Sequence, residues 1–356
     1  MSRRSLATVI AVPLMVGLWL AAALVPVPYV TSRPGLTVDV LAETQGQEII
    51  QIEGHRTYYD GGELRMTTVA SDGAEDNVSL FSALRAWLSD DQAVQPFDSV
   101  YRRGETNQQN REEAHQDMVT SQDVAVAVAL KELGYEIPLG VKVSGVPEGS
   151  PSAGKLEVND ELVQVGDTKV TDADALLATV KEAEAGEPLP IVVKRDGKRV
   201  RVEVTPETVT DDDGSERVAL GINIGTGFVF PFDVQVNINP AIGGPSAGLV
   251  FALAIYDTLT EGSLTGGRNI AGTGALDVDG AVEPIGGIQQ KIAGARDSGS
   301  ELFLVPAANC AEAVGADNGD MRLTRVATFE DAKEAIEAFA EDRDAKLPTC
   351  SGDDGK

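Results

Sequence analysis

The sequence predicts an α/β fold that carries a smaller β-rich module and an N-terminal transmembrane helix. Three observations lead to this prediction. Residues 6–30 form an uncharged, mostly apolar run. Residues 34–137 and 220–345 alternate short β-like segments with segments of helical periodicity, which is typical of α/β proteins. Between these two flanks, residues 140–204 consist mainly of short predicted strands. The length of 356 residues allows two or three domains.

The apolar run at residues 6–30 follows two arginines. About 20 apolar residues are enough for a helix to cross a membrane. Positive charge before such a run predicts a cytoplasmic N-terminus and an extracytoplasmic remainder. A cleaved signal peptide is the alternative, with the three alanines at 21–23 as its cleavage site. The length of the run and the prolines after it favour a retained anchor. We therefore expect residues 1–33 to be a cytoplasmic tip and a single-pass transmembrane helix in the cell membrane.

The first flank, residues 34–137, begins with predicted strands and ends with predicted helices. Residues 48–52 and 64–69 have the alternation of strands. Residues 77–88 carry leucines at helical spacing, and residues 117–133 predict a stronger helix. Ser121 on that helix is expected to pack or cap, and not to act as a nucleophile.

The remaining segments predict the rest of the fold. They are a helix at 172–183, a hairpin around Asp196-Gly197, an acidic linker at 208–219 that includes Asp211-Asp212-Asp213, a buried strand end at 303–306, a closing helix at 328–340 and a polar tail at 346–356. A polar chain end of this kind is usually loosely held. The linker and the tail divide the chain into the expected domains.

Charge and missing motifs exclude several functions. The chain has 56 acidic and 29 basic residues and a net charge of −27, whereas nucleic-acid binding requires basic surfaces. The sequence contains no Gly-x4-Gly-Lys-Ser/Thr loop for ATP. It contains no His-Glu-x-x-His motif and no cysteine cluster with metal-ligand spacing. We therefore expect no nucleic-acid partner, no metal and no cofactor.

A glycine-rich loop with one serine is the first candidate for chemistry. Gly243, Gly244 and Pro245 precede Ser246, and an apolar run at 249–256 follows. This pattern predicts a tight loop that leads into a helix. Backbone amides at such a place can hold the oxyanion that forms during acyl transfer. The alternative is that Ser246 only caps the helix.

Downstream motifs extend this candidate. The order Gly-Pro-Ser-Ala-Gly, then Thr273-Gly274, then Pro-Ile-Gly-Gly-Ile-x-x-Lys ending at Lys291 resembles the proteolytic domain of the Lon family of serine peptidases. The resemblance implies a catalytic dyad in which Ser246 is the nucleophile and Lys291 is the general base. It also places Thr273 beside the dyad, where its hydroxyl would orient the lysine amine. Amides of Gly243 and Gly244 would contribute to the oxyanion site.

The chemistry agrees with this resemblance. A serine hydroxyl needs a base, and neither His55 nor His115 lies in a triad-like context. A lysine can replace histidine, provided that burial lowers its pKa from about 10.4 towards neutrality. Residues 281–295 provide an apolar, glycine-rich setting for Lys291. The alternative is a solvated surface lysine, which is the usual state of this residue.

The β-rich module resembles a PDZ domain of the type found in bacterial proteases. The residues that carry this resemblance are Gly149-Ser150-Pro151-Ser152-Ala153-Gly154 and the segment from Asn159 to Asp167. PDZ domains bind extended peptides by adding a strand to a sheet edge. The resemblance implies a peptide-binding loop near Leu139, Gly140 and Val141. The alternative is a spacer domain without a ligand.

Taken whole, the chain resembles the PDZ-containing Lon-like protease family of Gram-positive bacteria. The resemblance implies a membrane-anchored, ATP-independent serine endopeptidase that cleaves extracytoplasmic proteins, with the PDZ-like domain binding substrates or regulators. It implies a Lon-type proteolytic domain in two parts, 34–137 and 220–345, with the PDZ-like domain inserted at 138–207. Lon proteolytic domains commonly form homo-oligomeric rings. A non-catalytic PDZ adaptor at the membrane and a protein that cleaves only its own chain are the alternatives.

The two cysteines, Cys310 and Cys350, are expected to form one disulfide. Two cysteines in an exported chain favour this interpretation over two unpaired thiols. Closing a loop of about 40 residues stabilises a protein by roughly 4 kcal/mol in chain-entropy terms. The disulfide would tie the polar tail to the region that follows the strand at 303–306.

Overall fold

The computed structural model describes residues 3–44, 46–195, 198–210 and 214–350. It divides into two compact units. The larger unit comprises Met1–Gln51, Arg56–Glu132 and Gln235–Lys356, and the smaller unit comprises Ile52–His55 and Leu133–Val234. The smaller unit is therefore inserted in sequence between two parts of the larger one. Each unit is described separately below.

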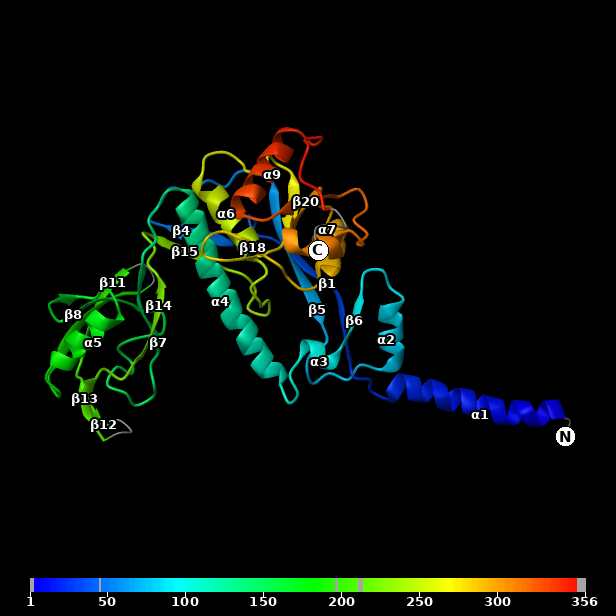
Figure 1. The fold of residues 1–356 in the computed structure, drawn as a ribbon, viewed down its shortest axis with the longest axis horizontal. Helices are drawn as coiled ribbons and strands as arrows, with labels where there is room; N and C mark the ends of the chain where they lie inside the picture. Colours follow the sequence, from blue (N-terminus) through cyan, green and yellow to red (C-terminus); the bar gives the residue numbers. More distant parts are fainter. Residues whose placement is uncertain (1–2, 45, 196–197, 211–213, 351–356) are drawn as a thin grey trace. The chain divides into compact units, whose positions relative to one another are not determined.

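A six-stranded mixed sheet forms the centre of the larger unit (Figure 1). The strands from one edge to the other are β20 (Arg322–Val326), β19 (Leu302–Pro306), β16 (Asn269–Gly272), β5 (Glu63–Ser71), β1 (Tyr29–Asp39) and β6 (Ala93–Pro96). The first four are mutually parallel, whereas β1 runs antiparallel to both of its neighbours. All five residues of β19 are buried, which explains why this strand is a continuous apolar run.

Helices pack on this sheet and on one another. They are α1 (Arg3–Leu24), α2 (Leu80–Trp87), α3 (Phe97–Val100), α4 (Asn107–Glu132), α6 (Gly248–Leu259), α7 (Ile288–Asp297), α8 (Cys310–Ala313) and α9 (Phe329–Glu341), with a 3-10 turn at Ala307–Asn309. Almost every residue of α6 is buried, and most of them are apolar, so this helix packs against its neighbours on nearly all sides. The long helix α4 packs along α6, and α7 packs against β1 and β5 (Figure 1). Both α6 and α7 contact β5.

Short two-stranded sheets complete the larger unit and lead to the smaller one. They are β2 (Glu43–Thr44) with β3 (Gln47–Glu48), β17 (Ala275–Leu276) with β18 (Val282–Glu283), and β4 (Ile50–Glu53) with β15 (Asp233–Val236). The boundary between the two units falls within both β4 and β15.

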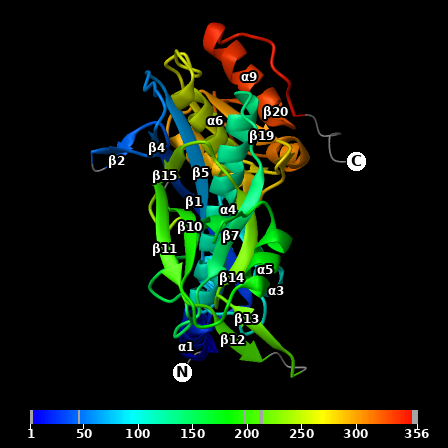
Figure 2. The ribbon, with the colours of Figure 1, turned by 90° about the vertical axis from the view of Figure 1, so that its left-hand side faces the viewer.

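The smaller unit is a β-rich domain whose described residues include helix α5 (Figure 2). Its sheet has the order β11 (Lys198–Val204), β10 (Leu189–Arg195), β8 (Glu161–Val165), β7 (Leu139–Gly145) and β14 (Asn223–Phe228), and β9 (Thr168–Lys169) pairs with β8. Helix α5 (Ala173–Glu182) begins at Asp172, whose carboxylate accepts a hydrogen bond from the amide of Ala175. Leu176 and Val180 of α5 lie in a core that also contains Leu220 and contacts Ile224.

The two ends of the smaller unit lie next to each other. The rings of Tyr135 and Phe232 meet at 5.6 Å between centroids, and the amide of Val229 donates a hydrogen bond to the carbonyl of Pro138. An insertion whose ends are adjacent can enter a host domain without disturbing it.

Two sequence predictions differ from the structure. The expected acidic linker at 208–219 is instead largely a hairpin, formed by β12 (Glu207–Thr210) and β13 (Glu216–Ala219). The chain up to Val234 also belongs to the smaller unit, so the second part of the larger unit begins at Gln235 and not at residue 220. Three consecutive β-branched residues, 208–210, and Val218 favour strands here, but the acidic residues around them led to the prediction of a linker. The acidic cluster at 211–213 and the hairpin turn at 196–197 lie outside the described residues.

The helix predicted at 117–133 starts ten residues earlier, at Asn107. Its first turns are polar and exposed, so they carry no apolar periodicity. The hydroxyl of Thr106 accepts a hydrogen bond from the amide of Gln109 and thereby satisfies one of the first free amides. This extension is important because it brings the N-terminal half of α4 to the candidate site.

A transmembrane helix was expected within residues 6–30, and the structure has α1 at Arg3–Leu24. In the part of the chain that the structure describes, none of the helices combines the length and the apolar character that crossing a membrane requires.

Candidate active site

Ser246 lies in the loop that leads into α6, and it is not the cap of that helix. The N-cap is Ala247, and no side chain caps the helix. The carbonyl of Ser246 accepts hydrogen bonds from the amide of Gly274 at 2.8 Å and from the hydroxyl of Thr273 at 2.9 Å. Its own hydroxyl is 2.7 Å from the amine of Lys291. The capping alternative therefore does not describe Ser246.

Helix α4 holds the serine loop from the other side. The amide of Gly244 donates to the carbonyl of Ala114 at 2.7 Å, and the hydroxyl of Ser121 donates to the carbonyl of Pro245 at 2.9 Å. A Cβ atom on Gly243 would lie 2.7 Å from the Cβ of Ala114, which is closer than such atoms approach. The loop thus needs glycine at 243, and Ser121 has the supporting role that its helix position indicated.

Lys291 occupies the second turn of α7 and is almost fully buried. Its side chain is 3% exposed, and its amide donates to the carbonyl of Gly287, the residue before the helix. Burial disfavours the charged amine and lowers the pKa of Lys291 to about 7. Within the described residues, no carboxylate forms an ion pair with it. Lys291 is therefore not a surface lysine, and a large fraction of it is neutral near neutral pH.

Thr273 follows β16 directly and connects the two other residues. Its hydroxyl donates to the carbonyl of Ser246 at 2.9 Å, and its oxygen accepts from the amine of Lys291 at 3.1 Å. The side chain is buried. Because its own proton is committed to a carbonyl, the oxygen lone pairs face the amine and fix where the nitrogen lies.

The backbone amides near Ser246 are not equally available. Gly243 and Gly244 were expected to hold an oxyanion, but the amide of Gly244 is already bonded to the carbonyl of Ala114. Pro245 has no N–H. Within the described chain, the amides of Gly243 and Ser246 have no hydrogen-bond partner. These two remain as donors, so the prediction is corrected for Gly244.

A cleft of about 790 Å³ opens above these residues. Strand β5 from Met66 to Ser71, the N-terminal half of α4, the loop at 239–247 and the segment at 284–286 line it. Its basic side chains are Arg111, His115 and Lys291, and none of the described residues that line it is acidic. No group of three or more His, Cys, Asp or Glu side chains among the described residues is placed to hold a metal ion.

The floor of the cleft presents a strand edge. β16 pairs with β5 only as far as the Gly272–Met66 register, whereas β1 pairs with β5 as far as Ser71. On the cleft side, the edge from Thr67 to Ser71 has no partner strand within the described chain. An extended peptide can add to such an edge through main-chain hydrogen bonds.

Asn309 supports the wall of the cleft that residues 284–286 form, and the sequence analysis did not identify it. Its side-chain oxygen accepts from the amide of Ile285, and its side-chain nitrogen donates to the carbonyl of the same residue, both at 2.9 Å. Asn309 is buried, and Ile285 lies in the cleft wall just before α7. The signal that could have revealed Asn309 was its place as a polar residue shortly after the apolar strand β19, which ends at Pro306.

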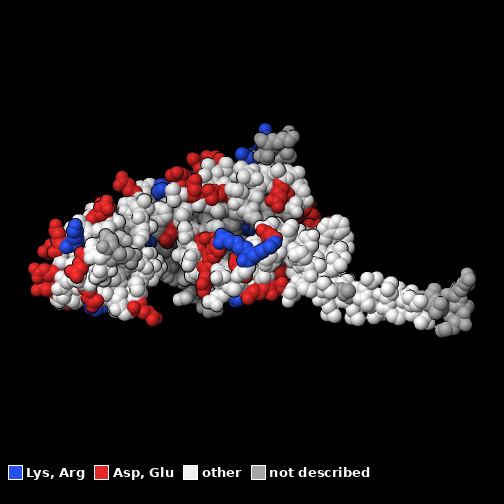
Figure 3. All heavy atoms as spheres, turned by 60° about the horizontal axis from the view of Figure 1, so that its bottom comes forward, with Lys and Arg blue, Asp and Glu red and all other residues white. Residues whose placement is uncertain are grey.

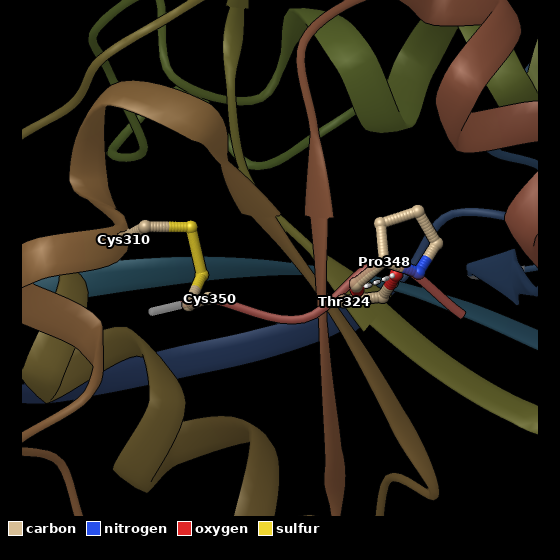
Figure 4. Close-up of a disulfide and its surroundings, with 4 residues drawn as sticks. All are labelled: Cys310, Thr324, Pro348 and Cys350. Atoms are coloured by element: carbon tan, nitrogen blue, oxygen red, sulfur yellow. Dashed lines mark hydrogen bonds between the residues drawn. A yellow bond between two sulfur atoms is a disulfide. The ribbon is translucent and has the colours of Figure 1, made fainter. Parts of the chain in front are cut away.

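The predicted disulfide between Cys310 and Cys350 is present (Figure 4). It ties the C-terminal segment to α8. The same segment lies along β20, because the carbonyl of Pro348 accepts from the hydroxyl of Thr324 at 2.9 Å and from the amide of Arg325 at 3.0 Å. Cys310 of the disulfide is therefore the next residue after Asn309, which contacts the cleft wall at Ile285.

The expected peptide-binding residues Leu139, Gly140 and Val141 lie on β7, where the edge that they need is occupied. β7 pairs with β14 along its whole length, and on its other side it meets β8 at Lys142. The outer strands of this sheet in the described chain are β14 and β11. A peptide that adds to the sheet must therefore use one of those strands, because β14 already takes the position beside β7.

Comparison with known proteins was consistent with both domains. Residues 238–331 match the family model of the Lon protease (S16) C-terminal proteolytic domain, and residues 108–205 match the PDZ domain model. The second match begins within α4 and ends before β14.

The individual relatives are Lon proteases, in agreement with the match to the proteolytic domain. The chain is 29% identical over 176 residues to a Lon protease of Campylobacter concisus, which covers 47% of this chain and 19% of the relative. It is 31% identical over 110 residues to Lon protease 2 of Bacillus subtilis, which covers 30% of this chain and 19% of the relative. This chain thus spans about a fifth of the length of these relatives.

A solved PDZ domain of an SdrC-like protein from Listeria innocua is 22% identical, with a TM-score of 0.22, and covers 24% of this chain and 92% of that domain. The motifs around Ser246 and Lys291 both fall within residues 238–331. The chain therefore contains a Lon (S16) C-terminal proteolytic domain at residues 238–331 together with a PDZ domain.

Proposed function

We propose that this protein is an ATP-independent serine endopeptidase in which Ser246 is the nucleophile and Lys291 is the general base. The observation that carries this proposal is the 2.7 Å contact between the lysine amine and the serine hydroxyl, inside a buried site that lowers the pKa of the lysine to about 7. A surface lysine at its usual pKa would be charged and could not accept a proton.

The reaction follows from this geometry. Neutral Lys291 accepts the hydroxyl proton of Ser246 as its oxygen attacks the scissile carbonyl. The amides of Gly243 and Ser246 stabilise the oxyanion. Protonated Lys291 then donates the proton to the leaving amine, which departs and leaves an acyl-enzyme. Water attacks the ester with the lysine again as base, and Ser246 is regenerated. Thr273 keeps the amine in place during these steps.

The substrate would be an extended segment of a protein or peptide. The free edge of β5 next to the dyad supports this, because a peptide that pairs with Thr67–Ser71 passes along the cleft. The cleft combines this edge with basic side chains at Arg111 and His115 in a protein of net charge −27. These features favour segments that carry neutral or acidic side chains.

The PDZ domain would bind substrates or regulators. Its outer strand β14 is preceded by Leu220 and Gly221, and Gly221 has a φ of +68°, which forms a tight glycine loop at the start of that strand. α5 packs on the same core. We propose β14, and not β7, as the strand to which a peptide adds. A spacer without a ligand is the alternative.

Membrane attachment, ATP independence and extracytoplasmic substrates are parts of the same proposal. The apolar run at residues 6–30 after two arginines supports a single-pass anchor with the bulk of the chain outside the cytoplasm. The disulfide supports an oxidising compartment. This sequence contains no ATP-binding loop. Assembly of several copies into a ring is an expectation from the family.

Labelling with an active-site serine probe tests the catalytic proposal. Wild type and Lys346→Ala, a change at an exposed lysine outside the site, should label equally. Ser246→Ala and Lys291→Ala should not label and should each lower peptidase turnover by on the order of a thousandfold or more, because members of one catalytic unit are not additive. Lys291→Arg should not restore turnover, because a guanidinium stays protonated.

Other outcomes favour the alternatives. Full turnover in both Ser246→Ala and Lys291→Ala would leave a non-catalytic adaptor as the better account. Mass spectrometry of purified wild type and Ser246→Ala separates a self-processing protein from a general peptidase. The self-processing alternative predicts a shortened wild-type chain, an intact variant, and no cleavage of added peptides.

A further inference from the structure

Helix α2 turns its large apolar side chains outward. These side chains lie on one helical face, here called the α2 apolar face: Leu80 (42% exposed), Phe81 (56%), Leu84 (47%) and Trp87 (72%), continued by Leu88 (76%). The opposite face carries the small residues Ala83 and Ala86, which are buried against the larger unit. Residues 80, 84, 87 and 88 are spaced by three or four, so the pattern is that of an amphipathic helix whose apolar side is exposed. An apolar patch of this size usually marks a binding surface.

The α2 apolar face lies where α1 ends. Pro26 forms an antiparallel bridge with Ser79, the N-cap of α2, and the amide of Val27 donates to the carbonyl of Val78 at 2.8 Å. Helix α1 also contacts α2 directly. Figure 1 shows α2 beside the C-terminal end of α1, and in Figure 3 the surface at that place is drawn white, whereas acidic side chains form separate patches over the rest of that face.

The chemistry of this face fits the interface of a lipid bilayer. Leucine and phenylalanine favour the acyl region, and tryptophan is enriched where acyl chains meet headgroups. The helix itself contains no Asp or Glu, and its charged residue is Arg85, whose long side chain can reach the headgroups. Nearby Asp91 is paired with Arg296 at 3.0 Å. The exposed apolar side chains of α1, such as Leu14, Trp19 and Leu24, continue the same apolar surface.

We propose that the α2 apolar face lies in the interfacial layer of the membrane that holds α1. This rests on the membrane attachment in the proposed function. Helix α2 would lie along the bilayer surface with its apolar side about 5–10 Å deep. Insertion is driven by apolar burial, because a chain of net charge −27 gains nothing from anionic lipids. The consequence is a second contact that holds the proteolytic domain against the bilayer at a fixed place.

The chain contains two tryptophans, Trp19 in α1 and Trp87 in α2, so each helix has its own fluorescent probe. We would reconstitute the full chain in phosphatidylcholine vesicles as two variants, Trp19→Phe and Trp87→Phe. Lipids brominated at shallow or deep positions of the acyl chains quench tryptophan according to depth. We expect Trp87 to be quenched most by shallow bromines and Trp19 by deeper ones. Quenching of Trp87 should persist at high salt.

Matched substitutions test the face itself. In the Trp19→Phe background, Phe81→Ser with Leu84→Ser removes two exposed apolar side chains of the α2 apolar face and should abolish quenching of Trp87. Leu177→Ser, at an equally exposed leucine of the smaller unit, should leave it unchanged. Peptidase activity and the melting temperature in detergent should be the same in all of these variants, because the substituted side chains are exposed.

The possible outcomes distinguish contact of α2 with the bilayer from anchoring by α1. Quenching of Trp19 without quenching of Trp87 would overturn the inference and leave the anchor intact. Absence of quenching at both tryptophans would overturn both. A concentration-dependent blue shift of Trp87 that brominated lipids do not quench would also overturn it and would show that a second copy of the chain covers the face.

Discussion

The amine of Lys291 lies 2.7 Å from the hydroxyl of Ser246, across a sequence separation of 45 residues. Ser246 lies in the loop before α6, whereas Lys291 lies on α7, and both helices contact β5. Their distance depends on the loop before α6, on Thr273 after β16, and on the start of α7. Changes in any of these elements should therefore affect the same reaction step.

The first prediction concerns the dependence of activity on pH. Because burial holds the pKa of Lys291 at about 7 and the neutral amine is the base, kcat/KM should rise with pH through an apparent pKa near that value and level off above it. Thr273→Val removes the hydroxyl that fixes the amine and should lower the plateau. A profile that rises only near the usual lysine pKa would contradict the assignment of Lys291.

The second prediction concerns stability. The pKa of Lys291 is about 7 in the folded protein, against its usual 10.5. The folded state therefore disfavours the bound proton, a cost that is complete below about pH 7 and disappears as the pH rises towards the unfolded pKa. Lys291→Met removes the cost. The free energy of unfolding should rise by roughly 3–5 kcal/mol at about pH 5 and by roughly 2 kcal/mol at about pH 9.

Urea unfolding of the wild type and Lys291→Met at both values of pH measures this difference. Lys346→Met is a suitable control, because it makes the same change at an exposed lysine outside the site. If Lys291→Met raised the free energy of unfolding by the same amount at both values of pH, Lys291 would be charged in the folded protein.

The third prediction concerns Asn309. Both polar atoms of its side chain bind the backbone of Ile285 in the cleft wall, so Asn309→Ala leaves a buried amide and carbonyl without partners. We expect a loss of about 1–3 kcal/mol in stability and a lower kcat/KM with an unchanged apparent pKa. Asn309→Asp keeps the acceptor and should retain part of the activity. If the pH profile shifts instead, Asn309 acts on the lysine and not on the wall.

The fourth prediction concerns the disulfide between Cys310 and Cys350. Thiol counting of denatured protein should detect no free thiol before reduction and two afterwards. Cys350→Ser should lower the free energy of unfolding by roughly 4 kcal/mol, because the bond closes a long loop. Reduction of the wild type should have the same effect as the substitution and should not affect Cys350→Ser. An unchanged stability in reduced wild type would contradict this account.

The sequence by itself determined the local features of this protein. Residue types and spacing indicated several elements of the larger unit, among them the strands at 64–69 and 303–306 and the helix at 328–340, and the disulfide partners. The motifs around Ser246 and Lys291 and the PDZ-like module were identified through their resemblance to known families. These features depend on neighbouring residues, whose periodicity and turn chemistry are visible in the chain. The roles of the dyad and the membrane anchor stay predictions.

Only the tertiary structure shows which hydrogen-bonding groups and strand edges already have partners. Only the fold shows that the amide of Gly244 is bonded to Ala114, that β14 occupies the edge of β7, and that Asn309 holds Ile285. Sequence spacing cannot reveal these contacts because each joins segments that are distant in the chain. Burial decided the rest, since the lowered pKa of Lys291 arises from every element that keeps water from its amine.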